Sequence, residues 1–159
     1  TAEALRVMNQ KIRDRELVKL YLCAIVGQIQ PPDGTLKGYL WKDEAKKQVF
    51  VKSRPVPGAR TAVTKYRTLT SGRGLSLLEC DLITGRTHQI RVHMAYIGHP
   101  VLGDPVYGGK RKETFGLTGQ CLHARKLAFQ HPRTGERMEV ECPLPDYFQE
   151  VLRKLSMWK

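Results

Sequence analysis

The sequence predicts an α+β fold in which several antiparallel strands are combined with about three helices. Short segments rich in branched and aromatic residues recur along the chain, and turns that contain Gly or Pro separate them. Other segments follow a helical period. Apolar residues make up 41% of the 159 residues and charged residues 26%, which is typical of a globular protein. We therefore expect a single domain over residues 1–159.

The chain is expected to begin with a helix and a strand. Apolar residues recur at three- and four-residue spacing in Ala2–Glu16, which indicates a helix. Leu17–Val26 is apolar on both faces except at Lys19, which indicates a strand in the centre of a sheet. Residues of high β-propensity predict the other strands at Leu36–Trp41, Gln48–Lys52, Ala62–Thr70, Leu75–Ile83, Leu122–Gln130 and Glu136–Cys142.

Two later segments return to a helical period. Between Thr84 and Ile97 the apolar residues lie on one helical face, and Gly98 provides a C-terminal stop. Residues 98–119 hold several Gly and Pro residues and are expected to form a loop. Asp146 is a suitable N-cap for a last helix over Tyr147–Leu155.

The chain is strongly basic, because 27 Lys and Arg residues against 15 Asp and Glu residues give a formal charge of +12. Such an excess favours binding to polyanions, with nucleic acid as the first candidate. An acidic membrane surface, a ribosome-like partner and a merely solvated surface are the alternatives. Nucleic acid is favoured because positive charge is concentrated in the basic segment 42–73, whose charged residues other than Asp43 and Glu44 are Lys42, Lys46, Lys47, Lys52, Arg54, Arg60, Lys65, Arg67 and Arg73.

Several classes of protein are disfavoured. The mean hydropathy is −0.40, and no apolar run is long enough for a membrane-spanning helix. The first residues lack the continuous apolar core of a secretory signal peptide. Because the sequence does not start with Met, we expect a fragment or a processed form.

Neither a metal nor a nucleotide cofactor is expected. The cysteines form no C-x-x-C pair and are interpreted as buried thiols of a reducing compartment; they are Cys23, Cys80, Cys121 and Cys142. His88 and His93 would face different sides of a helix, so polar packing or RNA contact is preferred to a metal site that they would form with His99. Gly108–Lys110 lacks the Walker A spacing, and Ser71–Gly74 lacks the G-x-G-x-x-G pattern.

The most unusual segment is Leu82–His93, where Arg86, Arg91 and two histidines open the expected helix directly after a strand. Unpaired N–H groups and the helix dipole favour anions at such a position. The segment therefore predicts an anion site, either for a phosphate or for a carboxylate of the protein itself. Arg91 lies at the border of the apolar face, so we expect it to be partly buried and paired.

Four blocks of this sequence resemble the RluA-type pseudouridine synthases, and they follow the family order from about Lys19 to Leu144. The blocks are the pattern Lys19, Tyr21, Ala24, Val26 and Gly27, then Thr84–His93, Gly98–Gly108, and Leu122–Arg125 with Leu127, Phe129, His131 and Pro132. The resemblance implies a mixed, mostly antiparallel sheet with flanking helices. It also implies an enzyme that isomerises uridine to pseudouridine in ribosomal or transfer RNA without a cofactor or metal.

The resemblance further implies roles for single residues. Tyr21 is similar to the family's active-site tyrosine, which packs on the target base and is implicated in proton removal at C5. Arg91 is similar to the arginine that pairs with the catalytic aspartate, and Leu122 to the apolar residue that lines the base pocket. Arg86 and His88 belong to the same motif and are expected to contact the RNA or to hold the loop, and Lys19 is expected to bind the substrate.

General chemistry agrees with these roles. A uridine in structured RNA must be flipped out of its stack, at a cost of roughly a few kcal/mol. Stacking on an aromatic ring such as that of Tyr21 returns about 1–3 kcal/mol. A buried carboxylate nucleophile needs a fixed cation to stay ionised, and Arg91 would supply it.

The block that carries the family's catalytic aspartate, Arg-Leu-Asp followed by a Thr-Ser-Gly-like turn, has no match in this sequence. Asp81 and Asp104 lie in other motifs and do not match the position of the nucleophile. In the family this block comes just before a helix that resembles Thr1–Glu16. We therefore expect the chain to begin shortly after the catalytic residue, to be inactive by itself and to expose strand edges.

Two alternatives to the enzyme remain open. The first is a catalytically dead RNA-binding or RNA-chaperone module, which the sequence upstream of Thr1 would distinguish from the enzyme. The second is a basic structural component of a ribonucleoprotein, in which Tyr21 and Arg91 would be dispensable and the basic segment 42–73 essential. RNA is the expected partner, and a monomer without membrane binding is expected. Basicity and free thiols favour the mitochondrial matrix, with a bacterial cytoplasm or a nucleus as alternatives.

Overall fold

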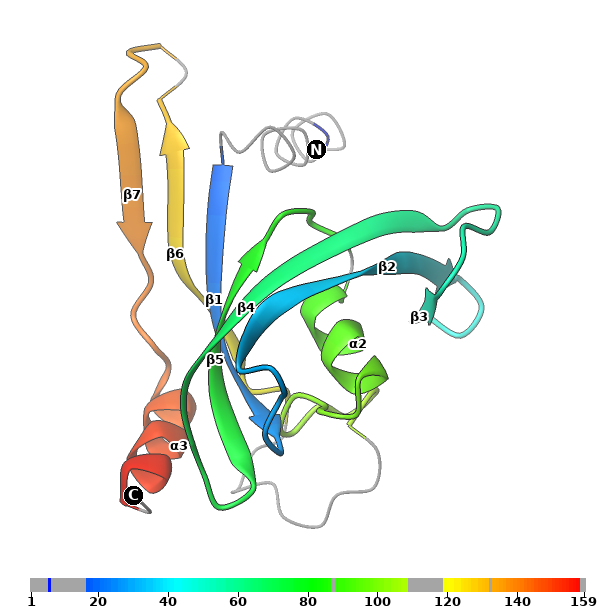
Figure 1. Cartoon of the computed structure of the whole chain (residues 1–159). Coiled ribbons are helices and arrows are strands. Elements are labelled where there is room, and N and C mark those ends of the chain that lie inside the picture. The colour runs from blue at the N-terminus through cyan, green and yellow to red at the C-terminus, as the bar shows by residue number, and fades with distance from the viewer. Residues whose placement is uncertain (1–5, 7–16, 87, 109–118, 132, 158–159) are drawn as a thin grey trace.

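The computed structural model describes residues 6, 17–86, 88–108, 119–131 and 133–157 (Figure 1). The expected helix Ala2–Glu16 lies outside these residues except for Arg6, which is helical. The elements, in chain order, are β1 (Leu17–Val26), β2 (Asp33–Asp43), β3 (Gln48–Lys52), β4 (Arg60–Gly72), β5 (Leu75–Leu82), α2 (Gln89–Tyr96), β6 (Leu122–Gln130), β7 (Arg137–Glu141) and α3 (Asp146–Met157).

The strands form one seven-stranded sheet in the order β3-β2-β4-β5-β1-β6-β7. All pairings between these strands are antiparallel. The prediction that Leu17–Val26 is a central strand is confirmed, because β1 lies between β5 and β6. The predicted α+β fold with a mostly antiparallel sheet is confirmed as well.

Two strands are longer than their local sequence predicts. β2 begins at Asp33, inside a segment with turn chemistry, because it pairs with β4 from Asp33 opposite Arg67 to Leu40 opposite Arg60. β4 continues to Gly72, where the turn to β5 follows with Arg73 and Gly74 at positive φ. Cross-strand pairing therefore overrides weak local propensity.

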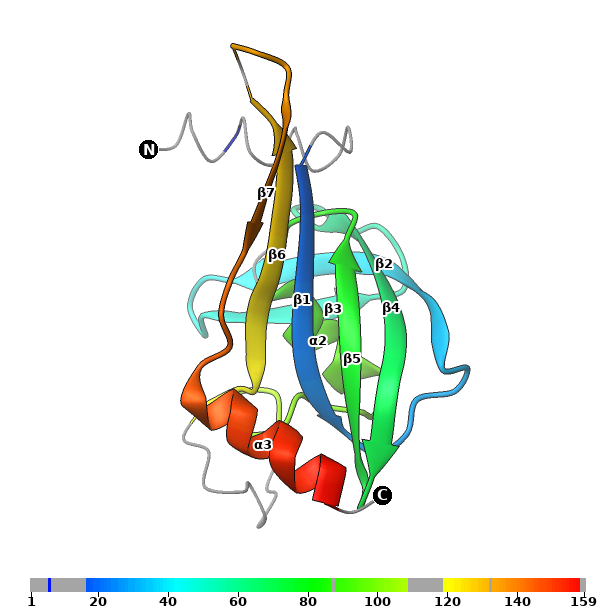
Figure 2. The same ribbon diagram turned by 90° about the vertical axis from the view of Figure 1, so that its left-hand side faces the viewer.

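The sheet is covered on both faces, which explains why β1 is apolar on both of its faces. Cys23 and Ile25 pack on one face with Ile90 and Met94 of α2. Leu22 and other residues pack on the opposite face with α3. Figure 2 shows α3 crossing in front of the sheet, with α2 behind it.

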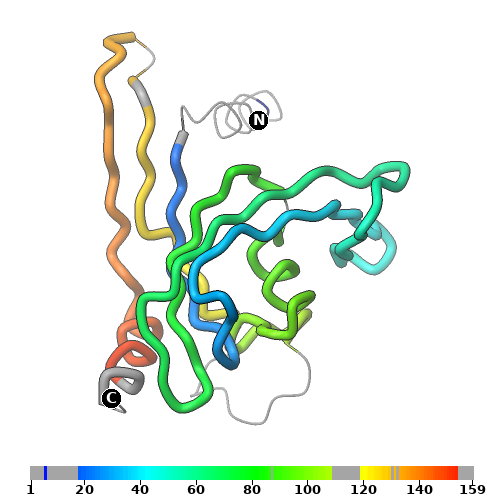
Figure 3. The backbone as a smooth tube through the Cα atoms, viewed as in Figure 1, coloured from blue at the N-terminus to red at the C-terminus, as the bar shows by residue number. Residues whose placement is uncertain are grey.

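Helix α2 is shorter and more buried than the sequence predicts. It begins only at Gln89, because His88 adopts a left-handed backbone conformation with φ 54°. β2 and β4 curve over the helix (Figure 3), and Val92 packs against Leu40 and Ala62 in a further core cluster. The residues from Gln89 to Met94 are all buried, so the expected amphipathic helix is instead enclosed on nearly all sides.

Three of the four cysteines are buried, as expected, while Cys142 is only partly buried. The sulfurs of Cys23 and Cys80 lie 3.8 Å apart on neighbouring strands, and both thiols are free. No helix in the described part of the chain is both long and apolar enough to cross a membrane.

We expect the packing of α3 to depend on Phe148, which is fully buried against Leu22 and Leu77. Phe148→Ala should lower the free energy of unfolding by about 3–5 kcal/mol, because it leaves a cavity. Tyr147→Ala is the matched control, since this neighbouring ring is 41% exposed. Urea unfolding measures both changes, and equal losses would contradict the assigned packing.

Candidate active site

Tyr21 and Leu122 lie on the sheet face that carries α2. Both are partly buried and pack against the core cluster that contains Ile90 of the helix. Their strands are neighbours, with Tyr21 opposite Ala124 and Cys23 opposite Leu122. The structure thus places the predicted aromatic residue and the predicted pocket residue on one surface.

The hydroxyl of Tyr21 is neutral near pH 7. Burial raises the pKa of Tyr21, and the neighbouring Cys142 raises it further. The side chain therefore presents an aromatic surface with a protonated phenol.

Arg91 follows Ile90 on α2, and its guanidinium is held by Asp104. Arg91 Nε donates to Asp104 Oδ2 at 2.8 Å, and Nη2 donates to Oδ1 at 2.9 Å. The side chain of Arg91 is 9% exposed and that of Asp104 is fully buried. The expectation that Arg91 is buried and paired is confirmed. Of the two anions that the sequence allows, the structure shows a carboxylate of the protein itself.

Asp104 is ionised because several donors surround its carboxylate. Oδ1 also accepts the backbone N–H groups of Val106 and Tyr107, at 2.9 and 3.0 Å. Burial raises the pKa of Asp104, but the hydrogen bond from Arg91 and those from the two N–H groups together lower it, and the net shift is downward. These bonds also close the turn that follows Asp104.

Tyr107 is a site residue to which the sequence analysis gives no role. Its ring lies over the guanidinium of Arg91, with 5.2 Å between Cζ and the ring centroid. Its hydroxyl accepts the backbone N–H of Val49 at 2.9 Å and lies 2.9 Å from His88 Nδ1. An Asp followed by a Pro is typical of a β-turn, and such a turn fixes the residue three positions after the Asp. This local pattern was the signal that could have pointed to Tyr107.

A second unpredicted residue, Gln89, attaches the start of α2 to β4. Its Oε1 accepts the hydroxyl of Thr84 at 2.7 Å and the N–H of Arg86 at 3.0 Å. Its Nε2 donates to the carbonyl of Val63 at 2.9 Å and to the hydroxyl of Thr64 at 2.8 Å. Both the oxygen and the nitrogen of the Gln89 amide thus have hydrogen-bond partners. These bonds fix the loop before the helix.

The other predicted residues are placed as follows. Arg86 Nε donates to the carbonyl of Thr61 at 2.9 Å, which ties this residue to β4. Its contact with RNA stays a prediction. Lys19 is partly buried and precedes Tyr21 by two residues on β1. Arg86 and His88 precede the helix rather than opening it, which corrects the predicted helix start.

The three histidines have different partners. His93 Nδ1 lies 3.0 Å from the hydroxyl of Thr64, and burial lowers the pKa of His93 to about 4. His99 Nδ1 lies 2.9 Å from the carbonyl of Val26, and His88 is bonded to Tyr107. The three rings therefore contact different partners in the folded chain.

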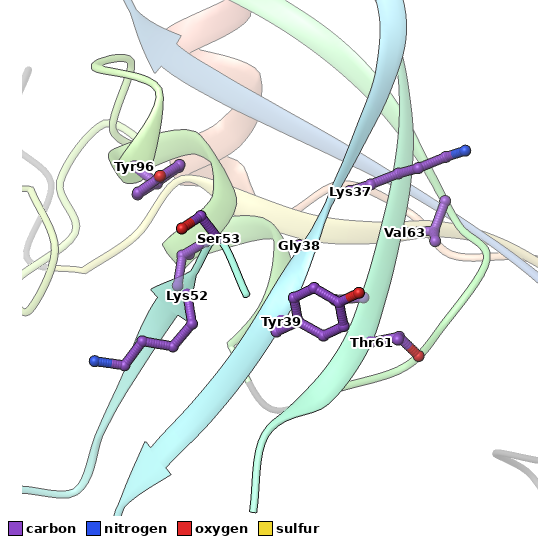
Figure 4. A pocket seen from close by; sticks show the side chains of 10 residues that line it. Lys37, Gly38, Tyr39, Lys52, Ser53, Thr61, Val63 and Tyr96 are labelled. Carbon is purple, nitrogen blue, oxygen red and sulfur yellow. The ribbon is translucent and has the colours of Figure 1, made fainter. Parts of the chain in front are cut away.

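The basic segment 42–73 is not one compact cluster in space. Lys42 and Lys46 lie at the β2–β3 turn, whereas Arg73 lies at the β4–β5 turn. A cavity of about 450 Å³ is lined by residues of β2, β3, β4 and α2, including Lys37, Lys52 and Tyr96 (Figure 4). Arg91, Tyr21 and Leu122 do not line it.

We expect the pair of Arg91 and Asp104 to stabilise the fold strongly. Asp104→Asn should lower the free energy of unfolding at pH 7 by about 3–5 kcal/mol, because it leaves the buried cation without its partner. Since the pKa of Asp104 is below its ordinary value of 3.8, the stabilisation is complete above that pH and is lost as the pH falls below it.

Urea unfolding at several pH values tests this expectation, with Glu44→Gln as the control. Glu44 pairs with Lys42 at 3.8 Å on the surface, and such a pair contributes about 0–1 kcal/mol. A cost for Asp104→Asn no larger than that of the control would contradict the assignment.

Comparison with known proteins places this chain in a family. The family model described as RNA pseudouridylate synthase matches residues 1–96. A Bacillus subtilis protein named as an uncharacterized RNA pseudouridine synthase, YlyB, is 40% identical over 149 residues, which cover 94% of this chain and 47% of that protein. The ribosomal large subunit pseudouridine synthase D of Pseudomonas aeruginosa is 37% identical over 166 residues, which cover 98% of this chain and 51% of that protein.

The solved structure of the human protein RNA pseudouridylate synthase domain containing 4 superposes with a TM-score of 0.76. It is 25% identical, and the match covers 98% of this chain and 69% of that one. The chain spans about half the length of the curated relatives it matches. Its fold, its motifs and more than half of its sequence agree with one family, and the chain belongs to the RNA pseudouridylate synthases.

Proposed function

We propose that this chain is part of the catalytic domain of an enzyme that isomerises uridine to pseudouridine in ribosomal or transfer RNA. The observation that carries the proposal is the placement of Tyr21 and Leu122 on the face of α2, where Arg91 is buried and fixed. The surface offers an aromatic ring for the base, an apolar wall and an oriented cation.

The proposed reaction is a rearrangement within one nucleotide. Isomerisation breaks the bond between N1 of uracil and C1′ of ribose, forms a bond from C5 to C1′, and moves the proton of C5 to N1. Substrate and product have the same composition, so no oxidant or reductant is consumed. Because the phenol of Tyr21 is neutral, it must lose its own proton before it can take the proton from C5.

We infer that the nucleophilic aspartate comes from outside this chain, and that the chain alone is inactive. The carboxylates of Asp33 and Asp43 accept backbone N–H groups of neighbouring turns or strands. Asp81 alternates with Cys80, the residue opposite Tyr21, and so lies on the other face of β5. The other described aspartates are Asp104, which is engaged by Arg91, and Asp146, which opens α3.

The pairing of Arg91 is compatible with a second carboxylate. Asp104 is bound through Nε and Nη2, so Nη1 lies outside the pair. A planar guanidinium presents separate edges to different acceptors. We infer that Asp104 orients one edge and that the catalytic aspartate binds another.

The function predicts how Arg91 behaves in the full-length protein. Arg91→Lys should lower the rate at saturating RNA more than about a hundredfold and leave the Kd for RNA nearly unchanged, because Arg91 faces carboxylates rather than phosphate. Single-turnover assays measure the rate, and filter binding measures the Kd. Arg91→Ala is the second variant and should be at least as inactive.

Arg125→Lys is the matched control, because Arg125 is an exposed arginine that pairs with Glu79 on β5. If the rate and the affinity of the Arg91 variants fell by the same factor, Arg91 would be an RNA contact and its proposed role would be wrong.

The basic segment 42–73 is expected to supply affinity rather than selectivity. Lys42→Gln with Lys46→Gln should reduce the slope of log affinity against log salt by about 0.7 for each phosphate that the protein no longer neutralises, without changing which uridine is modified. The control is Lys126→Gln with Arg137→Gln, which removes the same charge from β6 and β7. An unchanged slope would remove the β2–β3 turn from the RNA interface.

Other features of the whole protein stay proposals. The name of the Pseudomonas relative supports ribosomal RNA as the substrate class. A monomer and a location in the mitochondrial matrix remain predictions from the sequence. A catalytically dead RNA-binding module is the alternative, and it would bind RNA without converting uridine.

A further inference from the structure

The hydroxyl of Tyr107 connects β3 with the residue that precedes α2. Its oxygen lies 2.9 Å from the backbone nitrogen of Val49 and 2.9 Å from His88 Nδ1. Both tyrosine and histidine are partly buried. The hydrogen-bond roles at this oxygen determine the protonation pattern of His88.

One arrangement of protons lets the Tyr107 hydroxyl both accept and donate a hydrogen bond while every group stays neutral. The N–H of Val49 can only donate, so it takes a lone pair of the Tyr107 oxygen. In this arrangement the hydroxyl donates its own proton to His88 Nδ1, which accepts it. A neutral imidazole that accepts at Nδ1 carries its own proton on Nε2.

The surroundings of His88 favour its neutral form. Burial lowers the pKa of His88, the charge of Arg91 lowers it further, and Lys42 acts in the same direction. Asp104 opposes them. The net shift is downward, so the ring is neutral at pH 7 although a carboxylate lies nearby.

Tyr107 is itself fixed from two directions. Its backbone N–H donates to Asp104, and its ring lies over Arg91. It also meets the ring of His88 edge to face, with centroids 5.7 Å apart and an interplanar angle of 74°. His88 has φ 54°, a conformation that few residues other than glycine adopt, so the surrounding contacts hold it there.

We propose that Tyr107 is a positioning residue that holds His88 as the Nε2–H tautomer, and that this N–H donates a hydrogen bond to an oxygen of the RNA beside Arg91. The identity of the ligand rests on the proposed function, whereas the tautomer rests only on the contacts above. Because the neutral imidazole of His88 carries no charge, it can donate a hydrogen bond to the RNA next to Arg91 without attracting the carboxylates that Arg91 binds.

The tautomer is tested by the ¹⁵N chemical shifts of the histidine rings, measured without RNA. His99 is an internal reference of the opposite kind, because its Nδ1 faces the carbonyl of Val26 and must carry the proton. We expect Nε2–H for His88 and Nδ1–H for His99. In Tyr107→Phe the pKa of His88 should rise and its tautomer preference should weaken, while His99 stays unchanged. An Nδ1–H tautomer of His88 in the wild type, or no response to Tyr107→Phe, would overturn the proposal.

The donor role is tested by RNA binding to the full-length protein. His88→Ala should weaken the affinity about tenfold, and His88→Gln should recover most of it, because the glutamine amide can place an N–H near the position of Nε2. His131→Ala is the control, since His131 lies in the β6–β7 turn, where its ring accepts the N–H of Arg133. Equal affinity of the His88→Ala variant and the wild type would overturn the RNA contact.

Steady-state kinetics separate positioning from general destabilisation. Tyr107→Phe should raise KM for RNA and leave kcat nearly unchanged, because the hydroxyl orients a group that binds RNA. A loss of kcat with an unchanged KM would overturn the positioning role. If the wild type bound RNA through His88 but converted no uridine, the proposed function would fail while this inference would stand.

Discussion

The buried ion pair between Arg91 and Asp104 is the interaction on which the candidate site depends. Removing two charges from water is costly, and the cost is offset here because the carboxylate also accepts two backbone N–H groups. The pair joins α2 to the turn that carries Tyr107 and, through Tyr107, to β3. Gly108 completes the turn, because a Cβ at this position would collide with the carbonyl oxygen of Asp104.

The two-sided covering of the sheet makes such a pair possible. α3 covers one face, while α2 lies under the curved strands β2 and β4 on the other. A helix enclosed in this way can bury Gln89, Arg91 and His93 together, provided that each finds a partner. The contacts of these polar residues therefore determine the position of α2 against the sheet. This position places Arg91 on the same sheet face as Tyr21.

Positive charge has two separate roles in this molecule. Most of the lysines and arginines of the basic segment 42–73 are exposed, and such charges attract a polyanion from a distance with little dependence on sequence. Arg91 is different because it is buried and paired with the carboxylate of Asp104. The net charge of +12 is thus relevant to the affinity for RNA. The proposed chemistry depends instead on one buried cation, Arg91, which contributes little to the attraction of a distant polyanion.

Local pattern and composition were enough to predict the α+β class, the central position of β1, the buried thiols and the pairing of Arg91. The motifs also identified Tyr21 and Leu122, although their roles stay predictions. In contrast, the identity of Asp104 as the partner of Arg91 and the start of α2 at Gln89 became known only from the folded chain. Both depend on contacts between segments distant in the chain, and the energy of a buried charge is set by neighbours that no local pattern specifies.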